Sequence, residues 1–230
     1  MQLNSDSPMG CCPLVSVHMI TYNAINFIKQ ALDSVITQDY PSIEIAISDD
    51  ASNDGTQEIL IQYRAKYPNL IKLNLNEQNL GISKNANIAL SMCTGKYIAF
   101  FAGDDVMLPG KIKIQVDTME KNKNIGLCYH NMRVFDTVSG NTLYFFNEIN
   151  KPFQGNVTQL IRHGCFCGAV SVMMPRDTIY PKGFRESFPV ASDWLLYIES
   201  LIQNPDRKII YIDQVLSEYR RHSTNVTKAE

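Results

Sequence analysis

The sequence predicts an α/β protein in which helices cover both faces of a mostly parallel central sheet. From Pro13 to about residue 120, short apolar segments alternate with longer segments whose apolar residues recur every three or four positions. This alternation is typical of strands and helices in a parallel sheet. Hydrophobic residues make up 45% of the 230-residue chain and aromatic residues 10%, which is enough for a sizeable core. Because the chain has no repeat, low-complexity segment or linker, we expect one domain.

The first half of the chain contains predicted strands and helices in strict alternation. The helix at 24–37, for example, is predicted because the apolar residues Ile28, Ala31, Leu32 and Val35 recur at helical spacing. The strands are expected at 14–20, 44–48, 70–75 and 97–101, and the helices at 24–37, 56–67 and 82–92.

The second half is less regular and predicts a smaller mixed sheet. Ser139-Gly140 indicates a turn, and Ser192 is the expected N-cap of a helix that begins at Trp194. The strands are expected at 126–131, 134–146, 169–174 and 208–212, and the helices at 111–121, 158–163 and 194–203.

Charge and hydropathy exclude two classes of protein. Lys and Arg number 21 and Asp and Glu number 23, so the net charge is −2, no basic tract occurs, and we expect no nucleic-acid partner. No apolar run approaches the ~20 residues of a membrane helix, so we expect no transmembrane segment and at most peripheral membrane contact. Residues 1–12 lack the basic start and apolar centre of a signal peptide, and we expect them to form a flexible tail. A cytoplasmic location follows, including the inner face of the membrane.

The six cysteines are expected to be free thiols in a reducing compartment. His163, Cys165 and Cys167 alternate along the chain, and both residue types bind zinc. A fourth ligand is not evident, and a strand would separate these side chains by ~6–7 Å. We therefore favour packing over a zinc site at this position.

The strand at 97–101 is followed closely by two adjacent carboxylates, Asp104 and Asp105. Side chains at the carboxyl end of a parallel strand project into the crevice where ligands bind. Two unit charges ~4 Å apart repel each other by about 4 kcal/mol at an effective dielectric near 20. A Mg²⁺ or Mn²⁺ ion that bridges to a phosphate would neutralise them. The alternative is a solvated turn that contains two Asp residues.

A second strand, at 44–48, also ends in acids, Asp49 and Asp50. The residues from Asp50 onward resemble the start of a twelve-residue calcium-binding loop. The twelfth position of such a loop requires a bidentate Glu, but here it is Ile61. We therefore reject calcium. The first strand leads into Thr21-Tyr22-Asn23, so three strand ends are expected to meet at one crevice.

Four motifs in succession resemble the family 2 glycosyltransferases, which have the GT-A fold, a Rossmann-like arrangement. The resemblance is strong over about residues 13 to 120 and weaker to 227. The motifs are VSVHMITYN at 15–23, SDDASNDGT at 48–56, NLGISKN at 79–85 and TGKYIAFFAGDD at 94–105.

The resemblance implies an inverting, metal-dependent enzyme that moves a hexosyl or N-acetylhexosaminyl group from a nucleoside diphosphate donor, a UDP-sugar, to a hydroxyl of a glycan or lipid-linked glycan in polysaccharide biosynthesis. It further implies that residues 13–230 form a glycosyltransferase domain. Its first half, 13–115, would bind the nucleotide-sugar, and its second half, 116–230, would bind the acceptor.

The resemblance also implies a role for individual residues. Asp50 would accept a hydrogen bond from N3–H of uracil, Asp104 would contact the ribose, and Asp193 would be the general base. The other donor-binding residues would be Thr21, Tyr22, Asn23 and Lys84, and the ligands of Mn²⁺ or Mg²⁺ would be Asp105 and His222.

Two alternatives belong to other classes. A sugar nucleotidyltransferase would carry an early glycine-rich loop, but residues 15–27 contain no glycine. A binding module without catalysis would keep the donor residues and lack a working base.

The chain also departs from the family pattern, because Ala86-Asn87 stands where many members have Arg-Asn. Lys84 or a C-terminal Arg would then supply the charge for the diphosphate.

Overall fold

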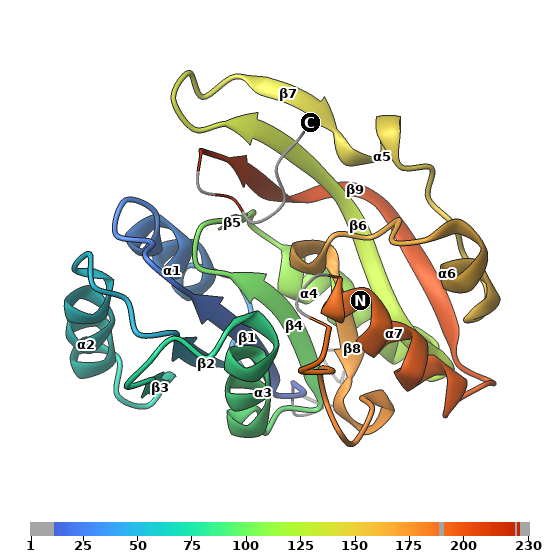
Figure 1. Cartoon of the computed structure of the whole chain (residues 1–230). Coiled ribbons are helices and arrows are strands. Elements are labelled where there is room, and N and C mark those ends of the chain that lie inside the picture. The colour runs from blue at the N-terminus through green and yellow to red at the C-terminus, as the bar shows by residue number, and fades with distance from the viewer. Residues whose placement is uncertain (1–11, 189–190, 224, 226–230) are drawn as a thin grey trace, which may run out of the picture.

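One large sheet organises the whole molecule (Figure 1). The computed structural model describes residues 12–188, 191–223 and 225, so the expected tail at 1–12 lies almost entirely outside the described residues. The sheet has nine strands in the order β3-β2-β1-β4-β8-β6-β9-β5, and β7 pairs with β6 outside this path. The strands are β1 (Val15–Thr21), β2 (Ile43–Asp49), β3 (Ile71–Leu75), β4 (Tyr97–Ala102), β5 (Val106–Met107), β6 (Ile125–Asp136), β7 (Thr142–Phe145), β8 (Met173–Pro175) and β9 (Lys208–Arg221).

The first half forms the parallel part of the sheet, as predicted. β1 pairs in parallel with β2 and β4, and β2 pairs in parallel with β3. The helices of the whole chain are α1 (Ile28–Ile36), α2 (Thr56–Lys66), α3 (Ile82–Met92), α4 (Lys111–Lys121), α5 (Phe146–Ile149), α6 (Thr158–His163) and α7 (Ser192–Ile202), with the short 3₁₀ helices η1 (Ala169–Ser171) and η2 (Arg176–Thr178).

Two buried clusters of apolar side chains lie on opposite faces of the sheet. Successive residues of a strand point to opposite faces, so Val17 of β1 and Ala99 of β4 join one cluster, whereas Ile98 and Phe100 join the other. Helices α1, α2 and α4 supply the first cluster, and α3, α6 and α7 supply the second. The predicted α/β class, with helices on both faces, is therefore confirmed.

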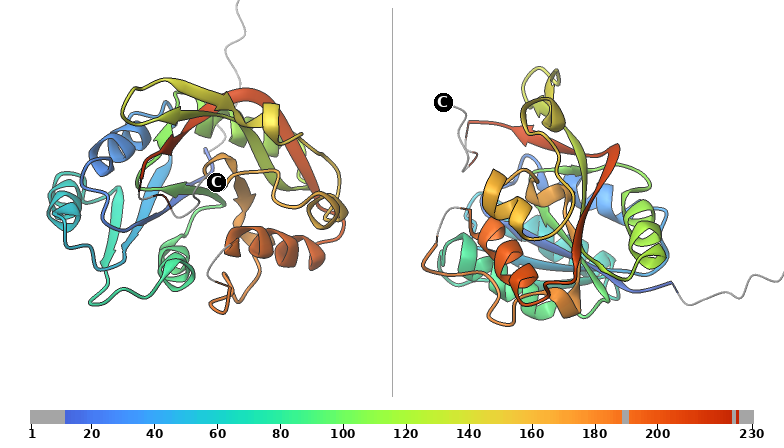
Figure 2. Two further views of the ribbon diagram at one scale, coloured as in Figure 1. Left: turned by 45° about the horizontal axis from the view of Figure 1, so that its top comes forward. Right: turned by 90° about the vertical axis from the view of Figure 1, so that its right-hand side faces the viewer.

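The second half extends the sheet with two strands that are longer than the sequence predicts and with others that are shorter. β6 is one strand where we expected a break after residue 131, and β9 continues to Arg221 where we expected it to end at residue 212. β6 and β9 run in parallel with register shifts near Asn131, so both strands bend and arch over the crevice end of the molecule (Figure 2). The predicted strand at 169–174 divides into η1 and β8, and β5 was not predicted.

Two expectations from the sequence concern the cysteines and the region around His163. Cys93, Cys128, Cys165 and Cys167 are free thiols. The His163 ring stacks on Phe153 with 3.7 Å between ring centroids, which agrees with packing at that position.

No helix within the described ranges is long and apolar enough to cross a bilayer.

The buried carboxylate of Glu44 joins three segments at the amino end of the sheet. It accepts hydrogen bonds from Ser16 Oγ at 2.5 Å and from the Thr94 backbone N–H at 2.6 Å, and Lys72 Nζ lies 2.8 Å away. Burial by itself raises the pKa of Glu44, but these hydrogen bonds outweigh it and lower the pKa from 4.5 to about 2.

We expect Glu44→Gln to lower the free energy of unfolding by about 2 kcal/mol at neutral pH, allowing for the half-exposed Lys72 partner. Because the folded pKa lies below the unfolded pKa, this contribution is complete above the unfolded value and is lost as the pH falls through about 2. Urea unfolding of both proteins across acidic pH measures it. The exposed Glu77→Gln is the control, and equal pH dependence of wild type and Glu44→Gln would contradict the assignment.

Candidate active site

Two adjoining cavities open at the carboxyl end of the parallel strands. The larger, about 510 Å³, is lined by the loop after β1, by Asp50, by the start of α3 and by His222. The smaller, about 260 Å³, reaches from the end of β4 to the start of α7 and includes Asp193. Ile20, Ile82, Ala102 and Asp104 line both cavities. The crevice therefore has two compartments, and Asp104 is the one charged residue that they share.

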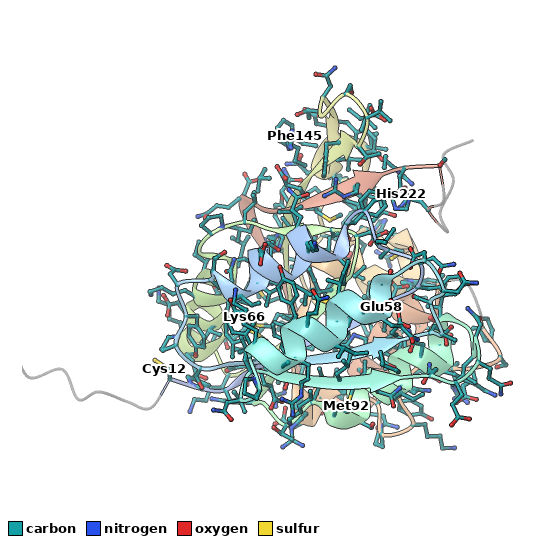
Figure 3. The ribbon with its side chains drawn as sticks, turned by 90° about the vertical axis from the view of Figure 1, so that its left-hand side faces the viewer. Cys12, Glu58, Lys66, Met92, Phe145 and His222 are labelled. Atoms are coloured by element: carbon teal, nitrogen blue, oxygen red, sulfur yellow. The ribbon has the colours of Figure 1, made fainter. Side chains whose placement is uncertain are left out.

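Figure 3 shows which end of the sheet carries this crevice. His222 lies toward the same end as Glu58, at the start of α2, whereas Lys66, at the end of that helix, lies toward the end marked by Cys12. In a parallel α/β unit the start of each helix follows the carboxyl end of a strand, so His222 lies at the carboxyl edge. The predicted convergence of strand ends is thus present in the fold.

The Asp50 carboxylate is buried and held by backbone amides. Its Oδ1 accepts from the Leu80 N–H at 2.8 Å and its Oδ2 accepts from the Gly81 N–H at 2.9 Å, while Asn76 Nδ2 lies 3.0 Å from Oδ1. Charge-assisted bonds of this kind fix the position of a carboxylate. Asp50 therefore presents its remaining lone pairs to the larger cavity in one orientation.

A chain of asparagines behind Asp50 was not predicted from the sequence. Asn76 Nδ2 lies 3.0 Å from Asn85 Oδ1, and Asn85 Nδ2 donates to the Ser48 carbonyl at 3.0 Å. Asn74 Nδ2 donates to Asn76 Oδ1 at 2.7 Å. These bonds join β2, β3 and α3 under the cavity. The signal in the sequence is Asn74-x-Asn76 at the end of a strand, where alternate side chains share a face.

The end of β1 and the loop after it contribute Thr21, Tyr22 and Asn23 to the lining of the larger cavity. Asn23 has φ 48°, a left-handed conformation that Asn tolerates, and its side-chain Oδ1 accepts from the Asn53 N–H at 3.0 Å. Tyr22 is half-exposed. Among the described residues, Thr21 Oγ1 is a buried hydroxyl with no hydrogen-bond partner. A polar atom left in this state beside a cavity is suited to a ligand contact.

The two carboxylates Asp104 and Asp105 have different surroundings. The Asp104 side chain is 29% exposed, and its Oδ2 lies 3.0 Å from Nε2 of His222. The Asp105 residue is only 2% exposed, and its Oδ1 accepts from the Arg220 backbone N–H at 2.9 Å. Burial, together with the negative charge of Asp104, raises the pKa of Asp105 well above its ordinary value. The exposed member of the pair is thus the one that contacts the predicted metal ligand His222.

Arg220 joins the end of β9 to the carboxylate pair, although the sequence suggested that basic residues here approach the diphosphate. The residue is 6% exposed, and its guanidinium lies over the rings of Phe27 and Phe135, at 4.9 Å and 4.7 Å from their centroids. Its Nε donates to the Asp104 carbonyl at 2.6 Å, and Nη2 donates to Gln30 Oε1 at 2.5 Å. The guanidinium is therefore used inside the protein.

Asp193 lies in the first turn of α7 and lines the smaller cavity. Ser192 does not cap this helix as expected; it is the first helical residue and is buried, and the N-cap is Ala191 with φ 58°. Asp193 Oδ1 accepts from the Trp194 N–H at 2.8 Å. Burial raises the pKa of Asp193. Trp194 packs with the apolar cluster and donates its indole N–H to the Leu160 carbonyl at 3.1 Å.

Lys84, the residue predicted to carry charge near the diphosphate, lies outside the lining of both cavities. The Lys84 side chain is 53% exposed, and its Nζ lies 3.9 Å from Glu186. Ala86, at the position where family members carry Arg, lines the smaller cavity beside His18. The ring of His18 is neutral, because burial lowers its pKa to about 4.

The residues predicted to hold a metal do not form a complete metal site by themselves. Across residues 12–188, 191–223 and 225, no three His, Cys, Asp or Glu side chains gather closely enough to bind an ion alone. Asp104 and His222 offer one carboxylate oxygen and one imidazole nitrogen beside the larger cavity. Mg²⁺ and Mn²⁺ are often held by one or two protein ligands, with water and substrate phosphate completing the shell.

Comparison with known proteins gives one family model and several relatives. The model described as Glycosyl transferase family 2 matches residues 16–177. The chain is 29% identical over 215 residues to an uncharacterized protein of Mycobacterium tuberculosis, covering 92% of this chain and 60% of that protein. It is 28% identical over 214 residues to the Escherichia coli protein WfgD, a UDP-Glc:alpha-D-GlcNAc-diphosphoundecaprenol beta-1,3-glucosyltransferase, covering 93% of this chain and 79% of the other.

Solved structures show the same fold. The S. aureus protein TarS 1-349, in complex with UDP-GlcNAc, superposes with a TM-score of 0.74 at 20% identity, covering 92% of this chain and 60% of that chain. This likeness confirms the predicted GT-A fold. The chain spans about 60% of the length of the mycobacterial relative and of this structure, so both extend beyond the part matched here.

We expect Arg220→Lys to lower the free energy of unfolding by about 2–4 kcal/mol, because Lys keeps the charge but loses the fork that binds Asp104, Thr137 and Gln30 at once. Chemical denaturation measures the change. Arg162→Lys, at an exposed position of α6, is the matched control. A loss below about 0.5 kcal/mol for Arg220→Lys, the size of ordinary surface changes, would contradict this role.

Proposed function

Because the chain belongs to glycosyl transferase family 2, we propose that it transfers a sugar from a nucleoside diphosphate donor to an acceptor hydroxyl with inversion at the anomeric carbon. The observation that carries this proposal is the pair of cavities that meet at Asp104, one containing Asp50 and the other containing Asp193. An inverting displacement needs the leaving group and the base on opposite sides of the sugar. The two compartments provide those two sides.

The donor in this proposal is a UDP-sugar, bound in the larger cavity. The Asp50 carboxylate can accept from N3–H of uracil, and its rigid attachment to Leu80 and Gly81 lowers the cost of ordering it on binding. Thr21, Tyr22 and Asn23 would face the base, and Asp104 would contact the ribose. The complex of TarS with UDP-GlcNAc, a protein of the same fold, supports a donor of this class.

We assign the divalent cation, Mn²⁺ or Mg²⁺, to the Asp104–Asp105 pair and His222. Both the carboxylate oxygens and the imidazole nitrogen are suitable ligands for Mn²⁺, and the Asp104–His222 contact places one of each at the edge of the larger cavity. When bound, the ion would neutralise charge on the diphosphate. Asp105 lies beside Asp104 in the lining of the smaller cavity, and its proposed role as a ligand rests on the resemblance to the family motif.

Asp193 is the proposed general base. It would take the proton from the acceptor hydroxyl as that oxygen forms a bond to the anomeric carbon, while the bond from this carbon to the diphosphate oxygen breaks. The raised pKa of Asp193 makes its carboxylate more basic than an exposed one. The hydrogen bond from the Trp194 N–H occupies Oδ1 and leaves Oδ2 for the hydroxyl.

The acceptor is proposed to be a hydroxyl of a glycan or of a lipid-linked glycan. The name of WfgD states a diphosphoundecaprenol-linked GlcNAc acceptor, and that protein matches 93% of this chain. A hydroxyl on such an acceptor would enter the smaller cavity, which is lined by Phe100, Phe184 and Val170 beside Asp193. With a lipid-linked acceptor, peripheral contact with a membrane would occur at the crevice end.

Calorimetry with Mn²⁺ and a panel of nucleoside diphosphates tests the donor. We expect UDP to bind most tightly and Asp50→Asn to weaken UDP binding about tenfold or more, because Asn has only one acceptor oxygen, whereas the N–H groups of Leu80 and Gly81 and N3–H of uracil all donate to Asp50. Glu58→Gln, an exposed carboxylate at the same end of the sheet, should bind UDP like wild type. Wild-type protein that binds no nucleoside diphosphate would overturn the proposed function.

Mass-spectrometric hydrolysis of nucleotide sugars tests the base without knowledge of the acceptor. We expect Asp193→Asn to slow hydrolysis at least about 100-fold while UDP affinity is retained. In wild type the rate should rise with pH over a range above that of an exposed Asp, because burial raises the Asp193 pKa and the base acts only when deprotonated. The exposed Asp206→Asn is the control. Hydrolysis of UDP-sugars by Asp193→Asn at the wild-type rate would exclude this base.

A further inference from the structure

A third cavity, of about 450 Å³, lies at the amino end of the parallel strands and is lined by four cationic side chains. Its size falls in the range of small-molecule sites. Apolar side chains of Met119, Ile125 and Pro175 form part of its wall. The cations are Lys96, Lys123, Arg176 and Arg207.

The sheet topology explains why cations from distant parts of the chain meet here. Lys96 precedes β4, Arg176 follows β8, Lys123 lies just before β6 and Arg207 precedes β9. These strands are adjacent in the sheet, in the order β4-β8-β6-β9. Because β8 is antiparallel to β4 and β6, its carboxyl end lies beside their amino ends. Four neighbouring strands therefore each present one cation at the same edge.

Backbone and side-chain contacts hold part of this cluster in place before any ligand binds. Arg176 Nε donates to the Gly95 carbonyl at 3.0 Å, and Arg207 Nη1 donates to the Lys123 carbonyl at 2.6 Å. Arg207 Nη2 also lies 3.2 Å from Asp177, and Lys96 pairs with Glu120. Preorganised cations of this kind bind an anion at lower entropic cost.

The cluster is positive even after its acidic partners are counted. Four cations face two carboxylates, Asp177 and Glu120, which leaves two positive charges in a chain whose net charge is −2. Within the part of the chain that the structure describes, no carboxylate lies within 4.0 Å of the Lys123 ammonium or the Arg176 guanidinium. These two cations are therefore available to an anion that enters the cavity.

We propose that this amino-edge cavity is an anion-binding site for a phosphate group, carried either by a small phosphorylated molecule or by a lipid headgroup. The planar guanidinium of Arg176 can bind two phosphate oxygens, and Lys123 adds a mobile point charge. The apolar wall suits the organic part of such a ligand. The site goes beyond the proposed transfer reaction, because β4 separates it from Asp104 by about 17 Å along the strand.

Calorimetry with inorganic phosphate and with pyrophosphate, without divalent cation and at low ionic strength, tests the small-molecule source. We expect binding by wild type that weakens about tenfold in the Lys123→Ala/Arg176→Ala double variant, since both charges contact the anion. The matched control is Arg64→Ala/Lys66→Ala on α2. It also removes two positive charges, but from residues that do not line the cavity. Lys123→Glu is a second variant for the same site, because the Lys123 side chain is exposed and Arg207 contacts only its backbone carbonyl.

Flotation with vesicles of phosphatidylcholine, with and without phosphatidylglycerol, tests the lipid source. Anion-dependent flotation that the cavity variants lose and the α2 control retains would assign the site to a headgroup. Binding of phosphate or pyrophosphate with the same pattern would assign it to a small ligand. The proposal is wrong if neither probe binds, or if the cavity variants bind them as well as wild type does.

Discussion

The buried contact between Arg220 and the Asp104–Asp105 segment is the constraint on which the crevice depends. A carboxylate as enclosed as Asp105 is costly unless donors and positive charge surround it. Arg220 supplies both, through its backbone N–H to Asp105 and its guanidinium to the Asp104 carbonyl. The same guanidinium reaches Gln30 in α1 and Thr137 after β6. Arg220, near the end of β9, therefore connects this last strand to helix α1.

The Arg220 contact gives the two neighbouring aspartates, Asp104 and Asp105, different surroundings. Asp105 turns inward to Arg220, so Asp104 is left at the junction of the two cavities, with His222 at its carboxylate. His222 in turn packs its ring 4.6 Å from that of Phe27. The end of β9 thus places a buried arginine and a cavity-facing histidine two residues apart, as alternate residues of an extended chain allow. Together with Asp50 and Asp193, these residues define a donor side and an acceptor side.

Local sequence patterns predicted the first half of the fold well and the second half less well. The helices at 82–92 and 111–121 begin and end where predicted, because apolar periodicity and flanking glycines mark them. The bulged pairing of β6 with β9 depends on contacts between residues about 80 positions apart, which no short window contains. β5 is only two residues long and is defined by pairing with Glu218 and Ser217, so it has no periodicity to detect. The Asn76–Asn85 contact behind Asp50 is likewise visible only once β3 and α3 are packed together.

The sequence by itself determined the α/β class, the acids at the ends of β2 and β4, and the resemblance to family 2 glycosyltransferases, because strand periodicity and short motifs are local properties. Only the tertiary structure decided how those residues divide the work. It turned Asp105 and Arg220 inward, aimed Lys84 toward Glu186, and gathered Lys96, Lys123, Arg176 and Arg207 at the opposite edge. Burial and charge pairing are set by neighbours that are distant in sequence, and for that reason the folded chain alone assigns them.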